Sequence, residues 1–161
     1  MQGLKELVQR LSKGGVDFGL AGGFGVVAQG GSLVTRDVSV ACRMEPDNMA
    51  KIFEILASVD PVHRMTPQRL PFTLEQAEKG GFKNLYLSTE WGQLDCLGEI
   101  KGIGGYAECL ARSESVNLDG VSVRVLTLDA LIEAKRAMGR PRDLHAVLEL
   151  EAIREKLRER R

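Results

Sequence analysis

The chain has 161 residues, of which 43% are hydrophobic and 27% are charged, and its 22 basic residues balance 22 acidic ones. These values are typical of an ordinary globular protein that buries about two-thirds of its chain surface on folding. Because coating DNA or a membrane is favoured by an excess of basic residues, the zero net charge argues against both roles.

The first half of the chain predicts three helices that alternate with two strands. Apolar residues at helical spacing indicate the first and third helices, and glycines begin the second. In chain order, the predicted elements are a helix over 4–11, a strand over 16–20, a helix over 22–29, a strand over 38–42 and a helix from 46 to 56.

The second half predicts mainly strands followed by two helices. Prolines make 59–71 irregular, and 98–105 is a glycine-rich loop. The predicted elements are a short helix over 73–79, strands over 82–89 and 93–97, a hairpin of 116–118 with 121–125, a helix over 127–138 and a last helix from Pro141. This order predicts the α/β (α+β) class: a mixed sheet with helices packed on it and a C-terminal helical pair. We expect a single domain over 1–161, with a core of about 16–126 and C-terminal helices over about 127–158.

The cysteines and the hydropathy pattern indicate a cytoplasmic protein. Cys42, Cys96 and Cys109 are far apart and lack the paired spacing of disulfide frameworks and metal clusters. The sequence also lacks a signal-peptide block and any run of 18 apolar residues. We therefore expect reduced, mostly buried thiols.

The stretch most informative about chemistry is Leu20-Ala21-Gly22-Gly23, followed after thirteen residues by Asp37-Val38-Ser39-Val40. A strand that runs into two glycines and a helix leaves backbone N–H groups free, and glycines allow a phosphate to approach them. Asp37 and Ser39 are two residues apart on the next strand, so their side chains point to the same face. Such a carboxylate is well placed to hold Mg²⁺ against a triphosphate.

This stretch resembles the minimal bacterial nucleotidyltransferases, which carry Gly-Gly or Gly-Ser, a spacer of this length and then Asp-apolar-Asp. The spacer of one subgroup reads Gly, two residues, Arg, one residue, Thr, one residue, Asp, and here the matching residues are Gly30, Leu33, Thr35 and Asp37. A later acidic strand of that family is matched best by Asp95.

The resemblance continues near the C-terminus. The segment 128–144 is similar to the helical segment of abortive-infection nucleotidyltransferase toxins, in which a lysine and an acidic residue lie near the active site. The matching residues here are Lys135 and Asp143. The resemblance, which spans about 16–150, thus implies a nucleotidyltransferase-like fold.

Three positions depart from the family pattern: Ser39 replaces the second carboxylate of the strand, Leu33 the arginine, and Ala146 a downstream acidic residue. A neutral Ser39 removes one negative charge and one strong oxygen ligand from a two-metal site. We therefore expect at most one Mg²⁺, held with a bound nucleotide by Asp37 and Asp95, and slow chemistry.

The resemblance implies two functions. The first is Mg²⁺-dependent transfer of a nucleoside monophosphate from an NTP to an unknown acceptor, which could be an RNA, a protein or a small molecule. Some relatives act as toxins, so an antitoxin-like partner is also implied. Its catalytic residues would be Asp37, Asp95 and Lys135. The nucleotide-binding residues would be Gly22, Gly23, Thr35, Ser39 and Asp143. The second function is the binding of a nucleotide or a partner protein by a chain that keeps the fold but has lost catalysis.

Other interpretations compete with these. The pattern Gly23-x-Gly25-x-x-Ala28 also satisfies the Rossmann dinucleotide-binding motif, although the nearest acidic residue at the expected spacing is Glu45 and the chain is short for such an enzyme. Lys135 could be a snorkelling lysine beside an apolar stripe. The basic cluster of Lys135, Arg136, Arg140 and Arg142 could contact phosphate or RNA, but helix-end charge on a solvated surface is the favoured interpretation.

Overall fold

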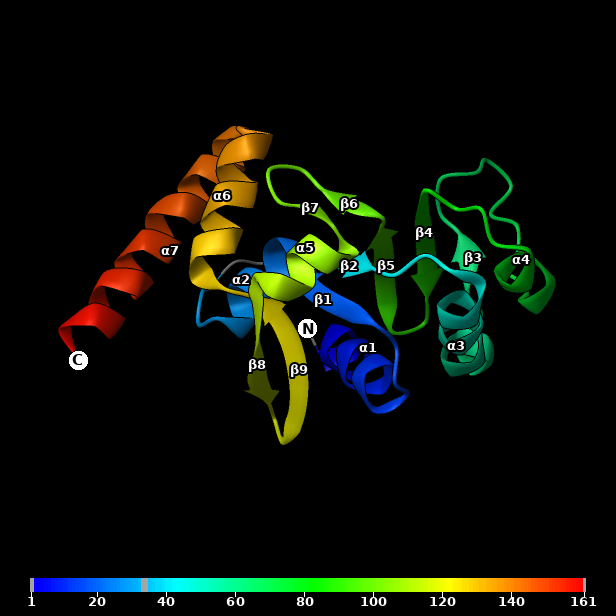
Figure 1. Ribbon diagram of the computed structural model, residues 1–161. Coiled ribbons are helices and arrows are strands. Elements are labelled where there is room, and N and C mark those ends of the chain that lie inside the picture. Colours follow the sequence, from blue (N-terminus) through cyan, green and yellow to red (C-terminus); the bar gives the residue numbers. More distant parts are fainter. Residues whose placement is uncertain (1, 33–34, 161) are drawn as a thin grey trace.

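The computed structural model describes residues 2–32 and 35–160, and within them a large mixed sheet is packed between helices (Figure 1). This arrangement, with paired helices at the C-terminal end, confirms the predicted fold class. Leu33, predicted to occupy an arginine position, lies outside the described residues. No helix in the described ranges is both long and apolar enough to span a membrane.

Seven strands of the described chain form the large sheet, in the spatial order β3-β4-β5-β2-β1-β9-β8. They are β1 (Phe18–Ala21), β2 (Asp37–Cys42), β3 (Val62–His63), β4 (Asn84–Thr89), β5 (Gly92–Leu97), β8 (Ser113–Leu118) and β9 (Val121–Leu126). The pairs β2–β5 and β1–β9 are parallel, and the other neighbours are antiparallel. Beside this sheet, β6 (Glu99–Ile100) pairs with β7 (Gly104–Gly105).

The helices begin and end where local chemistry predicts. Thr73 and Thr127 cap the helices that follow them, and Gly139, with a φ of 69°, ends the helix before the last one. The helices are α1 (Gln2–Lys13), α2 (Gly22–Ala28), α3 (Pro46–Leu56), the 3-10 turn η1 (Ala57–Val59), α4 (Leu74–Lys79), α5 (Tyr106–Ala111), α6 (Leu128–Met138) and α7 (Pro141–Glu159).

Three expectations were wrong. The stretch 59–71, predicted to be irregular, contains β3, and the predicted loop 98–105 contains β6 and β7. These strands have two residues each, too few to show a periodic pattern in the sequence. The Rossmann alternative fails because its β-α-β unit needs parallel strands, whereas β1 and β2 are antiparallel.

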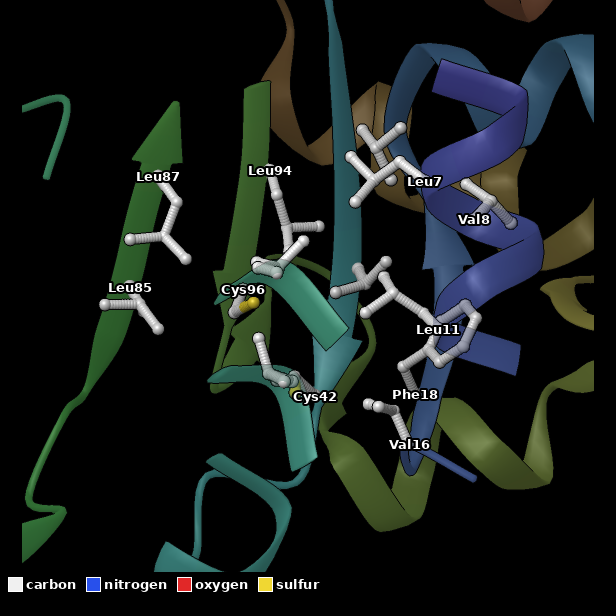
Figure 2. Packing of buried hydrophobic residues seen from close by; sticks show 14 of the residues in the cluster. Leu7, Val8, Leu11, Val16, Phe18, Cys42, Leu85, Leu87, Leu94 and Cys96 are labelled. Carbon is white, nitrogen blue, oxygen red and sulfur yellow. The ribbon is translucent and has the colours of Figure 1, made fainter. Parts of the chain in front are cut away.

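The apolar residues form two clusters, one on each face of the sheet. Figure 2 shows the first cluster, in which Leu7 and Leu11 of α1 point toward the side of the sheet on which Leu94 and Cys96 of β5 lie. The second cluster joins the opposite face to α5, α6 and α7. Consistent with the predicted reduced thiols, Cys42, Cys96 and Cys109 are free and buried.

The alternation of β2 and β5 decides where the polar side chains lie. Val38 and Val40 belong to the cluster beneath α1, so the residues between and beside them face the other way, toward α6 and α7. The same alternation on β5 buries Leu94 on the α1 side and directs Asp95 to the opposite face. The candidate site therefore lies on the face that the C-terminal helices cover.

Candidate functional site

Two carboxylates approach the site from neighbouring parallel strands. Asp37 of β2 is level with Gln93 of β5, and Ser39 is level with Asp95. Because the sheet places them on one face, Asp37 and Asp95 line the same pocket, with Ser39 between them. A serine thus occupies the position from which a carboxylate would complete an acidic group.

Gly22 forms the wall opposite Ser39. Its φ of +61° is in the left-handed region, and a Cβ atom at this position would lie 3.0 Å from the Ser39 Cβ and 3.2 Å from its Oγ. Glycine is therefore required both by the backbone conformation and by the close approach of the β2 side chain. Gly22 and Gly23 open α2, a short helix of seven residues, and both line the pocket.

Thr35 orders the carboxylate of Asp37 before β2 begins. The Thr35 hydroxyl lies 3.1 Å from the Asp37 Oδ1 and 3.0 Å from the Asp37 carbonyl oxygen. A hydroxyl has one hydrogen to donate, so it serves one of these acceptors at a time. Asp37 therefore keeps acceptor capacity directed to the pocket.

The α6–α7 junction supplies a buried carboxylate surrounded by cations. Asp143, which is 1% exposed, accepts bonds from Arg140 at Nε (2.6 Å), Nη2 (3.1 Å) and the backbone nitrogen (3.2 Å). The Lys135 Nζ lies 3.6 Å from the Asp143 Oδ1. Arg140 is the main cause of the lowered pKa of Asp143, and burial is the main cause of the lowered pKa of Lys135.

Asp95 is paired with a residue that sequence reasoning missed. The Arg64 guanidinium donates from Nη2 to the Asp95 Oδ1 and lies over the Tyr86 ring, 5.7 Å from its centroid. Burial raises the pKa of Asp95, and Arg64 opposes that rise. Arg64 could not be recognised in the sequence, because the short strand β3 that places it has no periodic signal.

These side chains enclose a pocket of about 290 Å³, which we call the polar pocket. It is lined by Gly22, Gly23, Thr35, Asp37, Ser39, Asp95, Lys135, Arg140, Arg142 and Asp143. All eight residues that the sequence singled out for a role are in this set, and the structure thus brings them together. Arg140 and Arg142, which had been interpreted as helix-end charge, line the pocket as well.

The cations in and behind the wall of the polar pocket outnumber its carboxylates. Three carboxylates (Asp37, Asp95 and Asp143) face three cations (Lys135, Arg140 and Arg142), and Arg64 adds a further positive charge behind Asp95. Asp143 is fully engaged by Arg140 and Lys135. The wall thus carries an excess of positive charge.

The donor set does not fit the two magnesium ions of a nucleotidyltransferase. In the described part of the chain, no three His, Cys, Asp or Glu side chains gather as they would around a metal. Mg²⁺ is held through carboxylates and substrate phosphates. Here one carboxylate position is Ser39, and the Asp95 carboxylate is already neutralised by Arg64.

A second cavity of about 310 Å³ adjoins the polar pocket and shares Gly22, Ser39, Lys135 and Arg140 with it. Much of its remaining wall is apolar or aromatic: Tyr86, Leu97, Ile100, Leu131, Ala134 and Met138. We call it the apolar cavity. It continues, through Asn84, Glu99 and Lys101, into an open cleft of about 1030 Å³ between β2, β4 and α5.

No family model matches this sequence, and a search of curated proteins gives no match either. Solved structures do match. A proposed nucleotidyltransferase from Thermotoga maritima aligns with a TM-score of 0.53 and 16% identity over 97% of this chain and 91% of its own. An antigenic nucleotidyltransferase-like protein from Paracoccidioides brasiliensis aligns with a TM-score of 0.60 and 14% identity over 92% of this chain and 75% of its own. The predicted resemblance is thus confirmed at the level of the fold, which is nucleotidyltransferase-like.

Proposed function

We propose that this chain binds a nucleoside triphosphate, with the phosphates in the polar pocket and the nucleoside in the apolar cavity, and that efficient nucleotide transfer has been lost. The observation that carries the proposal is the charge arrangement of the polar pocket. Its cations outnumber its free carboxylates, because Arg64 neutralises Asp95 and the α6–α7 junction neutralises Asp143. Such a wall attracts an anion more strongly than a bare cation.

The shape of the two cavities supports this assignment. The volume of each cavity alone is near the lower limit for small-molecule sites, about 300 Å³. The combined volume of the two lies well within the usual range. Charged side chains line one and apolar side chains the other, which matches the two ends of a nucleotide. Lys135 and Arg140 lie on the wall between them, where they can contact the phosphates.

Calorimetric titration with ATP, GTP, CTP and UTP tests the proposal. We expect Lys135→Gln to weaken nucleotide binding by roughly tenfold or more, because a charge-assisted hydrogen bond contributes about 1.5–3 kcal/mol. Arg136→Gln is the matched control, since its side chain pairs with Glu151 on the same helix pair and is not part of the pocket wall. If no nucleotide binds to the folded protein, the proposal is wrong.

Residual transfer is a second candidate, favoured by Asp37 and Asp95 lining one pocket from paired parallel strands. In this case Asp37 would hold the nucleotide's metal and an acceptor hydroxyl would enter through the open cleft. Incubation with NTP labelled at the α-phosphate, in the presence of Mg²⁺ and cellular RNA or protein, would reveal slow labelling of an acceptor. Labelling that persists unchanged in Asp37→Asn would argue against this candidate.

A further inference from the structure

We infer that the polar pocket takes its triphosphate as the metal-free anion, with Arg64 supplying to Asp95 the positive charge that a divalent cation would otherwise provide. The inference rests on the proposed nucleotide binding and specifies the form of the ligand. It starts from the disagreement between the donor set of this chain and the two-ion site that the fold implies.

Arg64 is held in place by several neighbours at once. It follows β3 directly, and its backbone nitrogen donates to the Tyr86 carbonyl of β4 over 3.0 Å. Its side chain then passes over the Tyr86 ring to reach Asp95 on β5. The Arg64 side chain is 19% exposed and that of Asp95 14%, so the pair is largely protected from solvent screening.

This arrangement leaves the guanidinium as a permanent charge at the carboxylate. Arginine does not lose its proton at physiological pH, unlike a histidine or a buried lysine. A metal ion at Asp95 would have to displace Arg64 or share the carboxylate with it, against the repulsion of two positive charges. Ser39, level with Asp95, offers only a neutral hydroxyl in compensation.

The other side of the polar pocket favours the free anion. Lys135, Arg140 and Arg142 line the space where the phosphates would lie. A triphosphate without its metal carries more negative charge than its magnesium complex, so this cationic wall binds it more strongly. Asp37 is the one pocket carboxylate without a cation among its described ion pairs, so this chain offers Mg²⁺ the fewest carboxylates with which such an ion is usually held beside substrate phosphates.

The deciding experiment is calorimetric titration of the wild-type chain with ATP in EDTA and, separately, in excess Mg²⁺. We expect binding in EDTA that is as tight as in Mg²⁺ or several-fold tighter. Binding only in Mg²⁺ would overturn this inference while the proposed nucleotide binding stands. Absence of binding under both conditions would overturn both.

Variants of Arg64 show whether this residue sets the metal dependence. Arg64→Gln removes the charge and frees Asp95, so we expect affinity in EDTA to fall by about tenfold or more and Mg²⁺ to become stimulatory. Arg64→Lys keeps a positive charge and should remain independent of Mg²⁺. A change in the direction of the Mg²⁺ effect separates this role from a merely structural one, because a destabilised fold would weaken binding under both conditions.

A double variant tests the inference by restoring the acidic site. Arg64→Gln combined with Ser39→Asp places three carboxylates at positions 37, 39 and 95. We expect it to bind Mn²⁺, detected by electron paramagnetic resonance without any nucleotide, whereas the wild-type chain does not. Tight Mn²⁺ binding by the wild-type chain would contradict the inference. Arg112→Gln, whose partner Glu133 lies outside the polar pocket, is the charge-matched control.

Discussion

At the scale of single residues, the polar pocket is defined by close contacts rather than by size. Gly22 meets Ser39 across the pocket, and Arg64 meets Asp95 through the β4–β5 pair. Within the described residues, the Arg64 Nε is the one buried side-chain nitrogen or oxygen without a hydrogen-bond partner. Such a group costs stability, so the pairing of Arg64 with Asp95 must offset that cost.

Gly22→Ala should damage both the stability and the ligand binding of the chain. The positive φ of +61° costs about 1–2 kcal/mol for a residue with a Cβ, and the new atom would press on Ser39. Gly15→Ala is the control, because Gly15 has a φ of +75° but no described atom within 4 Å of its added Cβ. Urea unfolding should show a strain cost in both variants, with the larger cost in Gly22→Ala because of its added contact with Ser39, and calorimetry should show a loss of ATP binding in Gly22→Ala alone. Equal ATP binding by both variants would contradict the expectation that the close approach of Gly22 to Ser39 is needed for ATP binding.

At the scale of elements, the junction of α6 and α7 fixes the cationic wall. Gly139 ends α6 in a left-handed conformation, and Pro141 starts α7 at once. Asp143 accepts the Arg140 backbone N–H and so ties the start of α7 to the side chains that line the pocket. The short link therefore sets the spacing between Lys135 on one helix and Asp143 on the next.

The Asp143 carboxylate should make this junction sensitive to acid. Its pKa is lowered, first by the hydrogen bond from Arg140, so the ionised form is favoured in the folded state. The resulting stabilisation is fully present above the ordinary pKa of an aspartate and is lost as pH falls through the lowered folded value. We expect Asp143→Asn to be less stable than wild type at neutral pH, by about 1–3 kcal/mol, with the difference shrinking in acid. Urea unfolding at a series of pH values measures this, and a difference that grows on acidification would refute it.

At the scale of the whole molecule, the large sheet lies between two apolar clusters. Strands β1 and β2 contribute side chains to both of them. β1 gives Phe18 and Leu20 to one cluster and Ala21 to the other, and β2 divides its residues in the same way. Helices α1 and α3 pack against one face of the sheet, whereas α6 and α7 pack against the opposite face. We propose that the chain folds as one unit, because neither cluster can form without the strands of the other.

Truncating a buried side chain on either face of the sheet tests whether the chain unfolds as one unit. Leu7 is 0% exposed on the α1 side and Leu131 is 1% exposed on the α6 side. We expect Leu7→Ala and Leu131→Ala each to lower the free energy of unfolding by about 2–5 kcal/mol, with a single transition in each case. Circular dichroism and Trp91 fluorescence should therefore give the same midpoint. Leu148→Ala, at a position 67% exposed, is the control and should change little. Two separated transitions would show that the faces unfold independently.

The sequence by itself determined the fold class and the main elements, because apolar periodicity, glycines and caps act locally along the chain. It also singled out Asp37 and Ser39, because alternation along a strand fixes which side chains share a face, whereas Asp95 was indicated by the resemblance to the nucleotidyltransferases. What only the tertiary structure decided is the state of these groups. The partnership of Arg64 with Asp95 depends on how β3, β4 and β5 pair, and the approach of Lys135 to Asp143 depends on how α6 packs against α7. Strand pairing and helix packing join residues that are distant in sequence, so the charge of the polar pocket could not be predicted from spacing alone.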